Sequence, residues 1–318
     1  MRVAVIGSGA IGGFLAGALA RGGLPVAVVA RGEHLAAIRR DGLRIESDLG
    51  SFRVAVEASD DLRQLGAFDV LLLAFKAHQW PPLLPQLADC ARAGATVVTF
   101  QNGVPFWYVR VPTLHSVDPE GRIGATFSDE QVLGGVVHVS GSVPQPGLVR
   151  QSGGLRYVLG DPRGLASERL DVLVAAMRAA GLEAQADPDV RATVWLKLVN
   201  NVGLNAVSTL RRLTIRPLLA DPDARAEVRA LMSEALEIGR AIGVVDAVDL
   251  DARLDYAARL DDVKTSMLQD FERGRELEIE PILGAAIELA ERYGVGVPGI
   301  RAAYAALRRF NPPEPPSA

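Results

Sequence analysis

A glycine-rich turn near the start of the chain restricts its fold more than any other feature. The segment "VAVIGSGAIGG", residues 3–13, is a short apolar run that breaks into G-x-G-x-x-G and opens the helix-like "GGFLAGALARGG". Glycines at these spacings permit a tight turn, close approach of a pyrophosphate, and close packing of helix on strand, with the phosphates at the helix N-terminus. The segment therefore predicts a dinucleotide-binding Rossmann unit. Its cofactor-binding residues are Gly7, Ser8, Gly9, Ala10, Ile11 and Gly12.

The end of the second predicted strand distinguishes the two nicotinamide dinucleotides. That strand covers residues 26–30 and is followed by Arg31 in "VVARGEH". NAD sites commonly carry an acid here to hold the ribose hydroxyls, whereas an arginine suits the 2′-phosphate of NADP. We therefore predict NADPH/NADP+ as the cofactor, with Arg31 contacting that phosphate. Two alternatives stay open: Arg31 can be a solvated turn residue, and Glu33 can serve a ribose diol.

The pattern of predicted secondary structure changes once along the chain. Up to about residue 161, runs such as "FDVLLLAF" and "ATVVTF" alternate with helical segments, and nearly all-apolar runs are typical of strands buried in a parallel sheet. Later runs, broken by "GSVPQPG", predict antiparallel strands at one edge. From "GDPRG" onward the β signal stops and amphipathic helix dominates. Because 318 residues exceed what one core usually serves, we predict an α/β, doubly wound NADP-binding Rossmann domain over residues 1–163. An all-helical substrate and catalytic domain follows over residues 164–318.

Composition and charge exclude several classes of protein. A hydrophobic fraction of 49% suits a globular protein with a sizeable core, and a net charge of −4 gives no footprint for nucleic acid. Met1 is followed at once by a strand-like run without a charged leader or a long apolar stretch, so we expect a cytoplasmic protein without a membrane partner. Cys90 is the single cysteine and the histidines are isolated, so no metal site is expected. Apolar periodicity does not separate core from dimer surface, which leaves a homodimer open.

Polar residues follow two of the predicted strands. Lys76 comes after the buried run in "LLLAFKAHQ", and Asn102 follows the next strand in "VVTFQNG". In doubly wound folds the ligand crevice lies beyond the carboxyl ends of the strands. We therefore predict that both side chains point into one crevice, beside the nicotinamide half of the cofactor. The alternative is a loop lysine and an Asn-Gly turn, which are common.

The segment "VWLKLVNNVGLNAVSTL", residues 194–210, predicts a helix with a polar stripe. Lys197, Asn201 and Asn205 recur every four residues, and steps of about 400° spread them over roughly 80° of arc. Apolar residues surround the stripe, so the lysine is expected in a partly dry site that lowers its pKa. Such a lysine can protonate the alkoxide left by hydride delivery to a carbonyl, while the asparagines bind substrate. Spacing alone does not exclude a snorkelling lysine with capping amides.

A later segment, "KTSMLQDFERGRELEIEPILGAAIEL", combines a serine and acids with another apolar helix. Ser266 can exchange a hydrogen bond with a ligand, and Glu278 can anchor a ribose hydroxyl or hold the Lys197 ammonium. A carboxylate beside a lysine favours the charged, proton-bearing form. The segment alone is also typical of an ordinary helix end with a capping acid, but together with the stripe it favours catalysis.

Six of these segments together resemble one enzyme family. They are "GSGAIGG", "FKAHQ", "QNG", "WLKLVNNVGLNA", "TSMLQD" and "LEIEPILG", in family order from Gly7 to about Pro298. They look like the ketopantoate reductases, also called 2-dehydropantoate 2-reductases. The resemblance implies a Rossmann domain, a helical domain of the 6-phosphogluconate dehydrogenase type, and an active site between them. It also implies NADPH-dependent reduction of 2-dehydropantoate to (R)-pantoate in pantothenate and coenzyme A biosynthesis.

The resemblance also implies residue roles. The family's general-acid lysine matches Lys197, and its glutamate that contacts the cofactor ribose and that lysine matches Glu278. Substrate-binding positions match Asn201, Asn205, Ser266 and Asn102. Cofactor-side positions match Arg31, Lys76, Asn102 and Glu278.

Two departures from the family pattern leave the 2-oxo acid substrate open. Trp107 and Tyr108 lie in an unexpectedly long, aromatic segment and can line a changed pocket or pack the loop onto the sheet. Ile215 stands where some members carry another substrate-side asparagine. Two alternatives therefore remain: a paralogue that reduces a different 2-oxo acid, and a non-catalytic NADP-binding sensor. A sensor needs only the nucleotide half, so the lysine stripe argues against it.

Overall fold

The chain folds into two compact units. A computed structural model describes residues 1–259 and 262–311. Residues 1–101 and 120–191 form the first unit, which we call the sheet unit. Residues 102–119 and the chain from 192 onward form the second, which we call the helical unit. The segment 102–119 thus leaves one unit, packs with the other, and returns.

The core of the sheet unit is a run of parallel strands. In spatial order these are β5 (Glu57–Ser59), β2 (Val26–Val29), β1 (Val3–Ile6), β6 (Val70–Leu73), β7 (Thr96–Thr99) and β8 (Val132–Gln145). The order places β1 in the centre and winds outward in both directions, as in dinucleotide-binding folds. The four residues of β1 are all buried, as are those of β2, β6 and β7, which agrees with strands covered on both faces. The predicted Rossmann architecture is confirmed.

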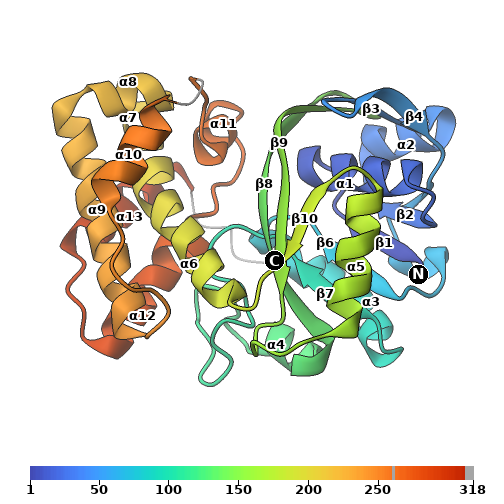
Figure 1. Ribbon diagram of the computed structural model, residues 1–318, viewed down its shortest axis with the longest axis horizontal. Helices are drawn as coiled ribbons and strands as arrows, with labels where there is room; N and C mark the ends of the chain where they lie inside the picture. Colours follow the sequence, from blue (N-terminus) through green and yellow to red (C-terminus); the bar gives the residue numbers. More distant parts are fainter. Residues whose placement is uncertain (260–261, 312–318) are drawn as a thin grey trace, which may run out of the picture. The chain divides into compact units, whose positions relative to one another are not determined.

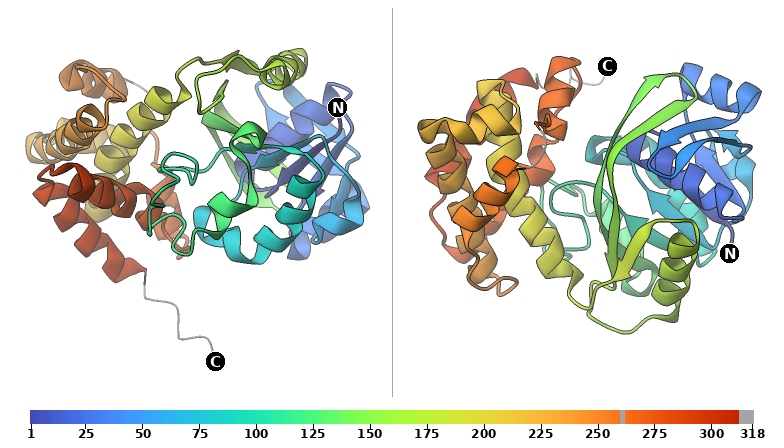
Figure 2. Two further views of the ribbon diagram at one scale, coloured as in Figure 1. Left: turned by 90° about the horizontal axis from the view of Figure 1, so that it is seen from below. Right: turned by 45° about the horizontal axis from the view of Figure 1, so that its top comes forward.

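Further strands extend this sheet beyond β8. The strand β9 (Leu148–Gly160) runs antiparallel to β8, and the two form a long hairpin (Figure 2). The short hairpin of β3 (Leu43–Ser47) and β4 (Gly50–Val54) joins through β3, which lies parallel to β9. The predicted antiparallel addition is therefore present, and "GSVPQPG" contains the end of β8 and the turn of the hairpin.

Helices cover the strands of the sheet unit (Figure 1). They are α1 (Ala10–Arg21), α2 (Gly32–Asp41), α3 (Trp80–Arg92), α4 (Arg122–Thr126) and α5 (Glu168–Ala179), with short turns η1 (Leu62–Leu65), η2 (Ala77–Gln79) and η3 (Asp129–Gln131). The helix α1 packs closely on the sheet because two of its own glycines face the strands. A Cβ on Gly17 would lie 2.5 Å from Ile45 Cγ1, and one on Gly13 would lie 2.7 Å from Val149 Cγ2. Phe14, on the same helix, is fully buried.

Residues 164–191 stay with the sheet unit although the sequence signal for strands stops before them. The short strand β10 (Glu183–Ala186) pairs in parallel with β9, and α5 packs on β10. This strand was not expected from the sequence, which indicated only helices after residue 163. The compact units divide between Arg191 and Ala192. The strand β10, which completes the sheet, therefore comes after the change from strand to helix patterns near residue 163.

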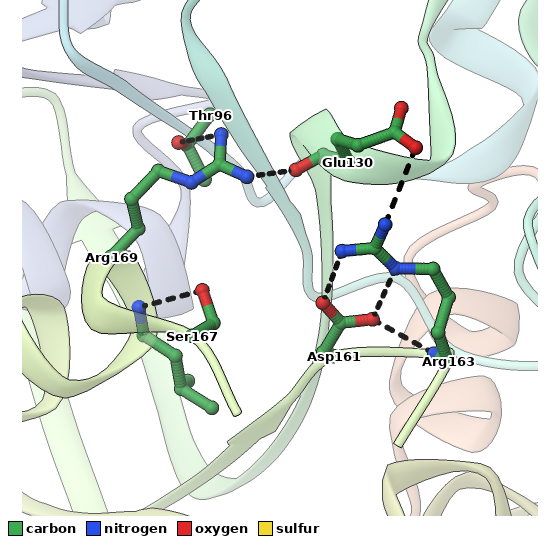
Figure 3. Close-up of polar contacts among 7 residues, drawn as sticks. Thr96, Glu130, Asp161, Arg163, Ser167 and Arg169 are labelled. Carbon is green, nitrogen blue, oxygen red and sulfur yellow. Dashed lines mark hydrogen bonds and ion pairs between the residues drawn. The ribbon is translucent and has the colours of Figure 1, made fainter. Parts of the chain in front are cut away.

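Two arginines tie the chain that follows β9 to the rest of the sheet unit (Figure 3). The buried Asp161 carboxylate accepts hydrogen bonds from the Arg163 backbone at 2.8 Å and from its guanidinium at 2.8 and 3.0 Å. Arg163 also reaches Glu130 Oε1 at 3.3 Å. Arg169 on α5 donates to the Glu130 carbonyl and to Thr96 Oγ1 of β7, the latter at 3.4 Å. These contacts hold α5 against the strands.

The helical unit is built around one long helix. In chain order its elements are α6 (Val190–Asn200), the π turn η4 (Asn201–Asn205), α7 (Ala206–Arg211), α8 (Ile215–Ala220), α9 (Pro222–Ala241), α10 (Leu250–Arg259), α11 (Ser266–Glu272), the π turn η5 (Glu280–Gly284), α12 (Ala285–Tyr293), α13 (Pro298–Leu307) and η6 (Arg308–Phe310). Packed against α9 are α8, α10, α12, α13 and η4. Among the described residues, no helix combines the length and apolar character needed to cross a membrane.

The Tyr157 hydroxyl gives a test of packing in the sheet unit. It is buried and has no hydrogen-bond partner among the described residues, and its ring makes an edge contact with Phe100 at 5.8 Å. Because an unsatisfied buried hydroxyl costs about 1–3 kcal/mol, we expect Tyr157→Phe to raise the free energy of unfolding by about 1 kcal/mol in urea titrations. Tyr304→Phe is the matched control, because the Tyr304 hydroxyl donates to Glu280 at 2.9 Å and its loss should destabilise. A less stable Tyr157→Phe protein would contradict this account.

Candidate active site

Two glycines of the G-x-G-x-x-G loop occupy positions that a side chain would disturb, and the third is open. Gly7 has φ +94°, and a Cβ there would lie 3.0 Å from the backbone of Ala74 and Phe75, just past β6. A Cβ on Gly12 would lie 2.0 Å from the Gly7 carbonyl oxygen. Gly9 is exposed, with open space where its Cβ would be. The loop thus has a tight turn, close helix–strand packing and an open backbone at the helix start, which together fit a pyrophosphate.

Backbone contacts place the two predicted basic residues of the sheet unit next to this loop. The Val29 carbonyl at the end of β2 accepts from the Gly7 and Ser8 N–H groups at 3.2 and 3.3 Å, and Arg31 follows as the exposed N-cap residue of α2. Lys76 follows the Ala74–Phe75 backbone that contacts Gly7, and its side chain is partly buried. Both cations therefore lie on chain segments that border the glycine loop.

The stripe of Lys197, Asn201 and Asn205 lies on the continuous helix formed by α6, η4 and α7. The structure differs from a plain α-helix because residues 201–205 form a π turn. A π turn is wider than an α turn, so the step from Asn201 to Asn205 rotates less than an α-helical step. The drift predicted from the spacing is thereby reduced. Gly203 allows this turn to pack closely on α9, since a Cβ there would lie 2.5 Å from Met232 Cγ.

The two stripe asparagines form a pair with an unused donor. Asn205 is buried, and its Nδ2 donates to Asn201 Oδ1 at 3.4 Å. The buried Asn201 Nδ2 has no hydrogen-bond partner among the described residues. A buried donor of this kind is costly unless a ligand or water accepts its hydrogen bond. The pair therefore presents an N–H group suited to a carbonyl, hydroxyl or carboxylate oxygen.

Lys197 has the electrostatic character of a proton donor. Burial of its ammonium lowers the pKa to about 8, while the Glu278 carboxylate acts in the opposite direction and keeps it from falling further. The lysine thus remains largely protonated at neutral pH but releases its proton more readily than a solvated lysine. The lowered pKa expected from the sequence is present.

Glu278 is held between a neighbouring π turn and the loop that follows β7. The π turn η5 begins two residues after it and packs on η4. Asn102 Nδ2 donates to Glu278 Oε2 at 3.3 Å. Next to Asn102, Gly103 has φ +84°, and a Cβ there would lie 2.3 Å from the Pro281 carbonyl oxygen. Asn102 therefore lies in the helical unit with Glu278, whereas Lys76 lies in the sheet unit.

Ser266 is the first residue of α11 and is exposed. The preceding Thr265 is buried, caps α11 by accepting from the Leu268 N–H at 3.3 Å, and shares a 2.7 Å hydrogen bond with Ser208 on α7. The helix α11 packs against α7 and η4. The structure therefore brings the Ser266 segment beside the helix that carries Asn205.

The aromatic loop is packed rather than open, and it packs on the helical unit. Trp107 and Tyr108 are buried, and the Tyr108 ring lies 5.8 Å from that of Trp195 on α6. Packing was one of the two expectations from the sequence, but the predicted partner, the sheet, was wrong, because the loop belongs to the helical unit. These rings pack in series, Trp107 on Tyr108 and Tyr108 on Trp195, in the interior of the helical unit.

Two anchors of this loop were missed by sequence reasoning. On α12, the Glu288 carboxylate accepts from the backbone N–H groups of His115 and Ser116 at 2.7 and 2.6 Å. One turn later, the Arg292 guanidinium donates to the Pro112 and Thr113 carbonyls, each at 2.7 Å. An acid and an arginine four residues apart look like an ordinary surface pair, so their spacing gave no sign of this role.

Comparison with known proteins places the chain in a family. The family model described as "Ketopantoate reductase PanE/ApbA" matches residues 3–164, and "Ketopantoate reductase PanE/ApbA C terminal" matches residues 189–311. A 2-dehydropantoate 2-reductase of Mesorhizobium japonicum is 40% identical, with 98% of each chain covered. The chain belongs to the ketopantoate reductase family. It is an oxidoreductase that acts on a CH–OH group, which disfavours the sensor alternative.

Solved structures agree with this assignment. A Ralstonia solanacearum protein, provisionally described as a ketopantoate reductase, is 35% identical with a TM-score of 0.91 over 97% of each chain. The 2-dehydropantoate 2-reductase of Methylococcus capsulatus is 28% identical with a TM-score of 0.85, over 98% of this chain and 97% of that one. Both likenesses cover the sheet unit and the helical unit together, so the predicted fold class is confirmed as a whole.

The influence of Glu278 on Lys197 can be measured without an activity assay. The chain has three lysines, Lys76, Lys197 and Lys264, so ¹³Cε labelling of lysine gives three NMR signals, assignable by Lys→Arg variants. We expect the Lys197 signal to titrate near pH 8. In Glu278→Gln it should titrate at lower pH, because the anion that stabilises the ammonium is gone.

The Lys264 signal is the internal control, since Lys264 pairs with Glu272 at 2.7 Å and should not respond to Glu278→Gln. An unchanged or raised Lys197 midpoint in this variant would show that the carboxylate does not support the ammonium.

Proposed function

We propose that the protein reduces 2-dehydropantoate to (R)-pantoate with NADPH, and that Lys197 is the general acid. The observation that carries this proposal is the Lys197 ammonium, with its pKa lowered to about 8 by burial and supported by Glu278, on the same helix as the unpaired Asn201 donor. A proton donor and an oxygen-binding amide on one helix can protonate and hold the oxygen of a carbonyl that a hydride reduces. Family membership supports the reaction class.

NADPH fits the sheet unit through the glycine loop and the two cations that border it. The exposed backbone at Gly9 would receive the pyrophosphate, and the exposed Arg31 would bind the 2′-phosphate. Lys76, Asn102 and Glu278 supply polar groups for the ribose and nicotinamide side. When bound, the cofactor supplies the hydride that reduces the substrate carbonyl.

The residues of the helical unit bind the substrate and supply the proton. The Lys197 ammonium donates a hydrogen bond to the carbonyl oxygen and then transfers its proton as negative charge develops there. Asn201 Nδ2 donates to a substrate oxygen, and Asn205 keeps the Asn201 amide oriented through its 3.4 Å hydrogen bond. Ser266, exposed at the start of α11, binds the substrate carboxylate or hydroxyl. Glu278 keeps Lys197 protonated before the reaction.

One observation favours a second candidate, in which the enzyme reduces a different 2-oxo acid. Ile215 begins α8 and is buried, so an apolar side chain packs at the position where some family members carry an amide. A site that loses a hydrogen-bonding amide discriminates less strongly for a hydroxyl-bearing substrate. The two candidates share the same lysine, cofactor and reaction, and differ only in the side chain of the acid.

Removal of the lysine tests the mechanism, and a substrate panel tests the specificity. We expect Lys197→Ala to lower kcat by about 10²–10⁴-fold, followed as NADPH oxidation with 2-dehydropantoate and with 2-oxo acids that lack its hydroxyl. Lys264→Ala is the control, because this exposed lysine pairs with Glu272 and should retain full activity. Full activity of Lys197→Ala would show that Lys197 is not the general acid. A higher kcat/KM for a 2-oxo acid without the hydroxyl would favour the second candidate.

Cofactor preference depends on Arg31 in this proposal. A charged hydrogen bond to the 2′-phosphate contributes about 1.5–3 kcal/mol, so Arg31→Ala should raise KM for NADPH about tenfold to a hundredfold and leave KM for NADH nearly unchanged. Glu33→Ala, two residues along α2, is the matched variant. If the wild type uses NADH as efficiently as NADPH, and Glu33→Ala is the variant that raises KM, the glutamate serves a ribose diol and the assignment of Arg31 is wrong.

A further inference from the structure

His34 joins three segments of the sheet unit that are distant in sequence. It lies in the first turn of α2, and its ring is partly buried. One ring nitrogen, Nε2, lies 2.8 Å from the carbonyl oxygen of Ser8 in the glycine loop. The other, Nδ1, lies 3.0 Å from the backbone nitrogen of Gly147, in the turn between β8 and β9. The ring therefore bridges the glycine loop and the hairpin turn.

The partners of the ring determine its chemical form. The Gly147 N–H can only donate, so Nδ1 must accept and carries no proton. The Ser8 carbonyl can only accept, so Nε2 must carry the proton and donate. The ring is therefore the neutral Nε2–H tautomer, and burial, which lowers the pKa of His34, favours this neutral form.

The bond to Ser8 controls the direction of the next backbone N–H. In a trans peptide the C=O and N–H groups point in opposite directions. The Ser8 carbonyl is directed at the His34 ring, so the N–H of the same peptide, which belongs to Gly9, points away from the ring. Ser8 is buried, whereas Gly9 is exposed, with open space where its Cβ would lie. The peptide thus has one end bonded inside the protein and the other free to meet a ligand.

We propose that His34 is a positioning residue for the dinucleotide phosphates, acting through the Ser8–Gly9 peptide. Its Nε2–H bond fixes this peptide with the Gly9 N–H directed outward, so the loop is already arranged for an anionic phosphate before binding. A loop held in its bound conformation loses less entropy when the ligand arrives and therefore binds more tightly. The inference rests on the proposed function, since it assumes that the glycine loop binds a nicotinamide dinucleotide.

The hairpin turn supplies the second support for the ring. Gly147 has φ +76°, and a Cβ there would lie 2.9 Å from Ala37 Cβ on α2, so the turn approaches the helix closely. Its N–H then holds Nδ1 and prevents the ring from turning about its χ2 axis. In this arrangement the Gly147 bond orients the histidine, and the Ser8 bond orients the loop.

Two isosteric variants separate these bonds. Gln carries its amide nitrogen at the position of Nε2, so His34→Gln can keep the bond to Ser8 and lose the bond to Gly147. Asn carries its amide oxygen at the position of Nδ1, so His34→Asn can keep the bond to Gly147 and lose the bond to Ser8. We would measure Kd for NADPH by the change in cofactor fluorescence on binding, together with Tm and kcat at saturating NADPH.

We expect His34→Gln to bind NADPH within about twofold of the wild type and His34→Asn to bind about three- to tenfold more weakly, as for the loss of one hydrogen bond. Their kcat values should be alike. Equal Kd values for the two variants, or a kcat loss without a Kd change, would overturn the inference. If the wild type itself binds no NADPH or NADH, the proposed function fails and the inference fails with it.

Discussion

Holding a lysine ammonium in a largely apolar helical bundle is the constraint around which the helical unit is organised. Burial lowers the pKa of Lys197 to about 8, and without a compensating carboxylate the same burial would drive it lower still. The carboxylate comes from Glu278, which is distant in sequence and is brought to the lysine by the contact of the two π turns, η4 and η5. π turns are rare in proteins and concentrate at functional sites. Here one of them carries the asparagine pair, and the other follows the glutamate.

The same constraint accounts for the position of the segment 102–119. Its first residue, Asn102, donates to Glu278, and the N–H of Val104 donates to the Pro281 carbonyl within η5 at 2.7 Å. A backbone carbonyl of this π turn thus binds the loop directly. The clamp of Glu288 and Arg292 then fastens the rest of the segment to α12. A loop that leaves the sheet at β7 is in this way made part of the helical unit.

Features that depend on backbone sterics or on spacing along one element could be predicted from the sequence. The glycine loop is of this kind, because each close approach at Gly7 and Gly12 requires the absence of a Cβ. The Lys197 stripe is another, because four-residue spacing places side chains along one helix. Features set by tertiary packing could not. Buried aromatic residues such as Trp107 predict packing but not the partner, and β10 is too short and too polar to show as a strand. No local signal announces a π turn, because the contacts around it are tertiary. The turn η4 packs against α9, and the Pro281 carbonyl of η5 accepts a hydrogen bond from Val104.

The sheet unit and the helical unit handle their ligand-binding groups by the same physical means. In each, a partly buried hydrogen bond fixes one end of a polar group so that its donor end is available to a ligand. In the glycine loop, the His34 ring holds the Ser8 carbonyl and leaves the Gly9 N–H directed outward. In the helical unit, Asn205 holds the Asn201 Oδ1 and leaves Nδ2 without a partner among the described residues. The buried Asn201 donor weakens the folded state while it lacks a partner, whereas the exposed Gly9 N–H is hydrated until a ligand replaces the water. Both donors are suited to ligands whose oxygens accept these bonds. The phosphates of a dinucleotide and the oxygens of a 2-oxo acid are ligands of that chemistry.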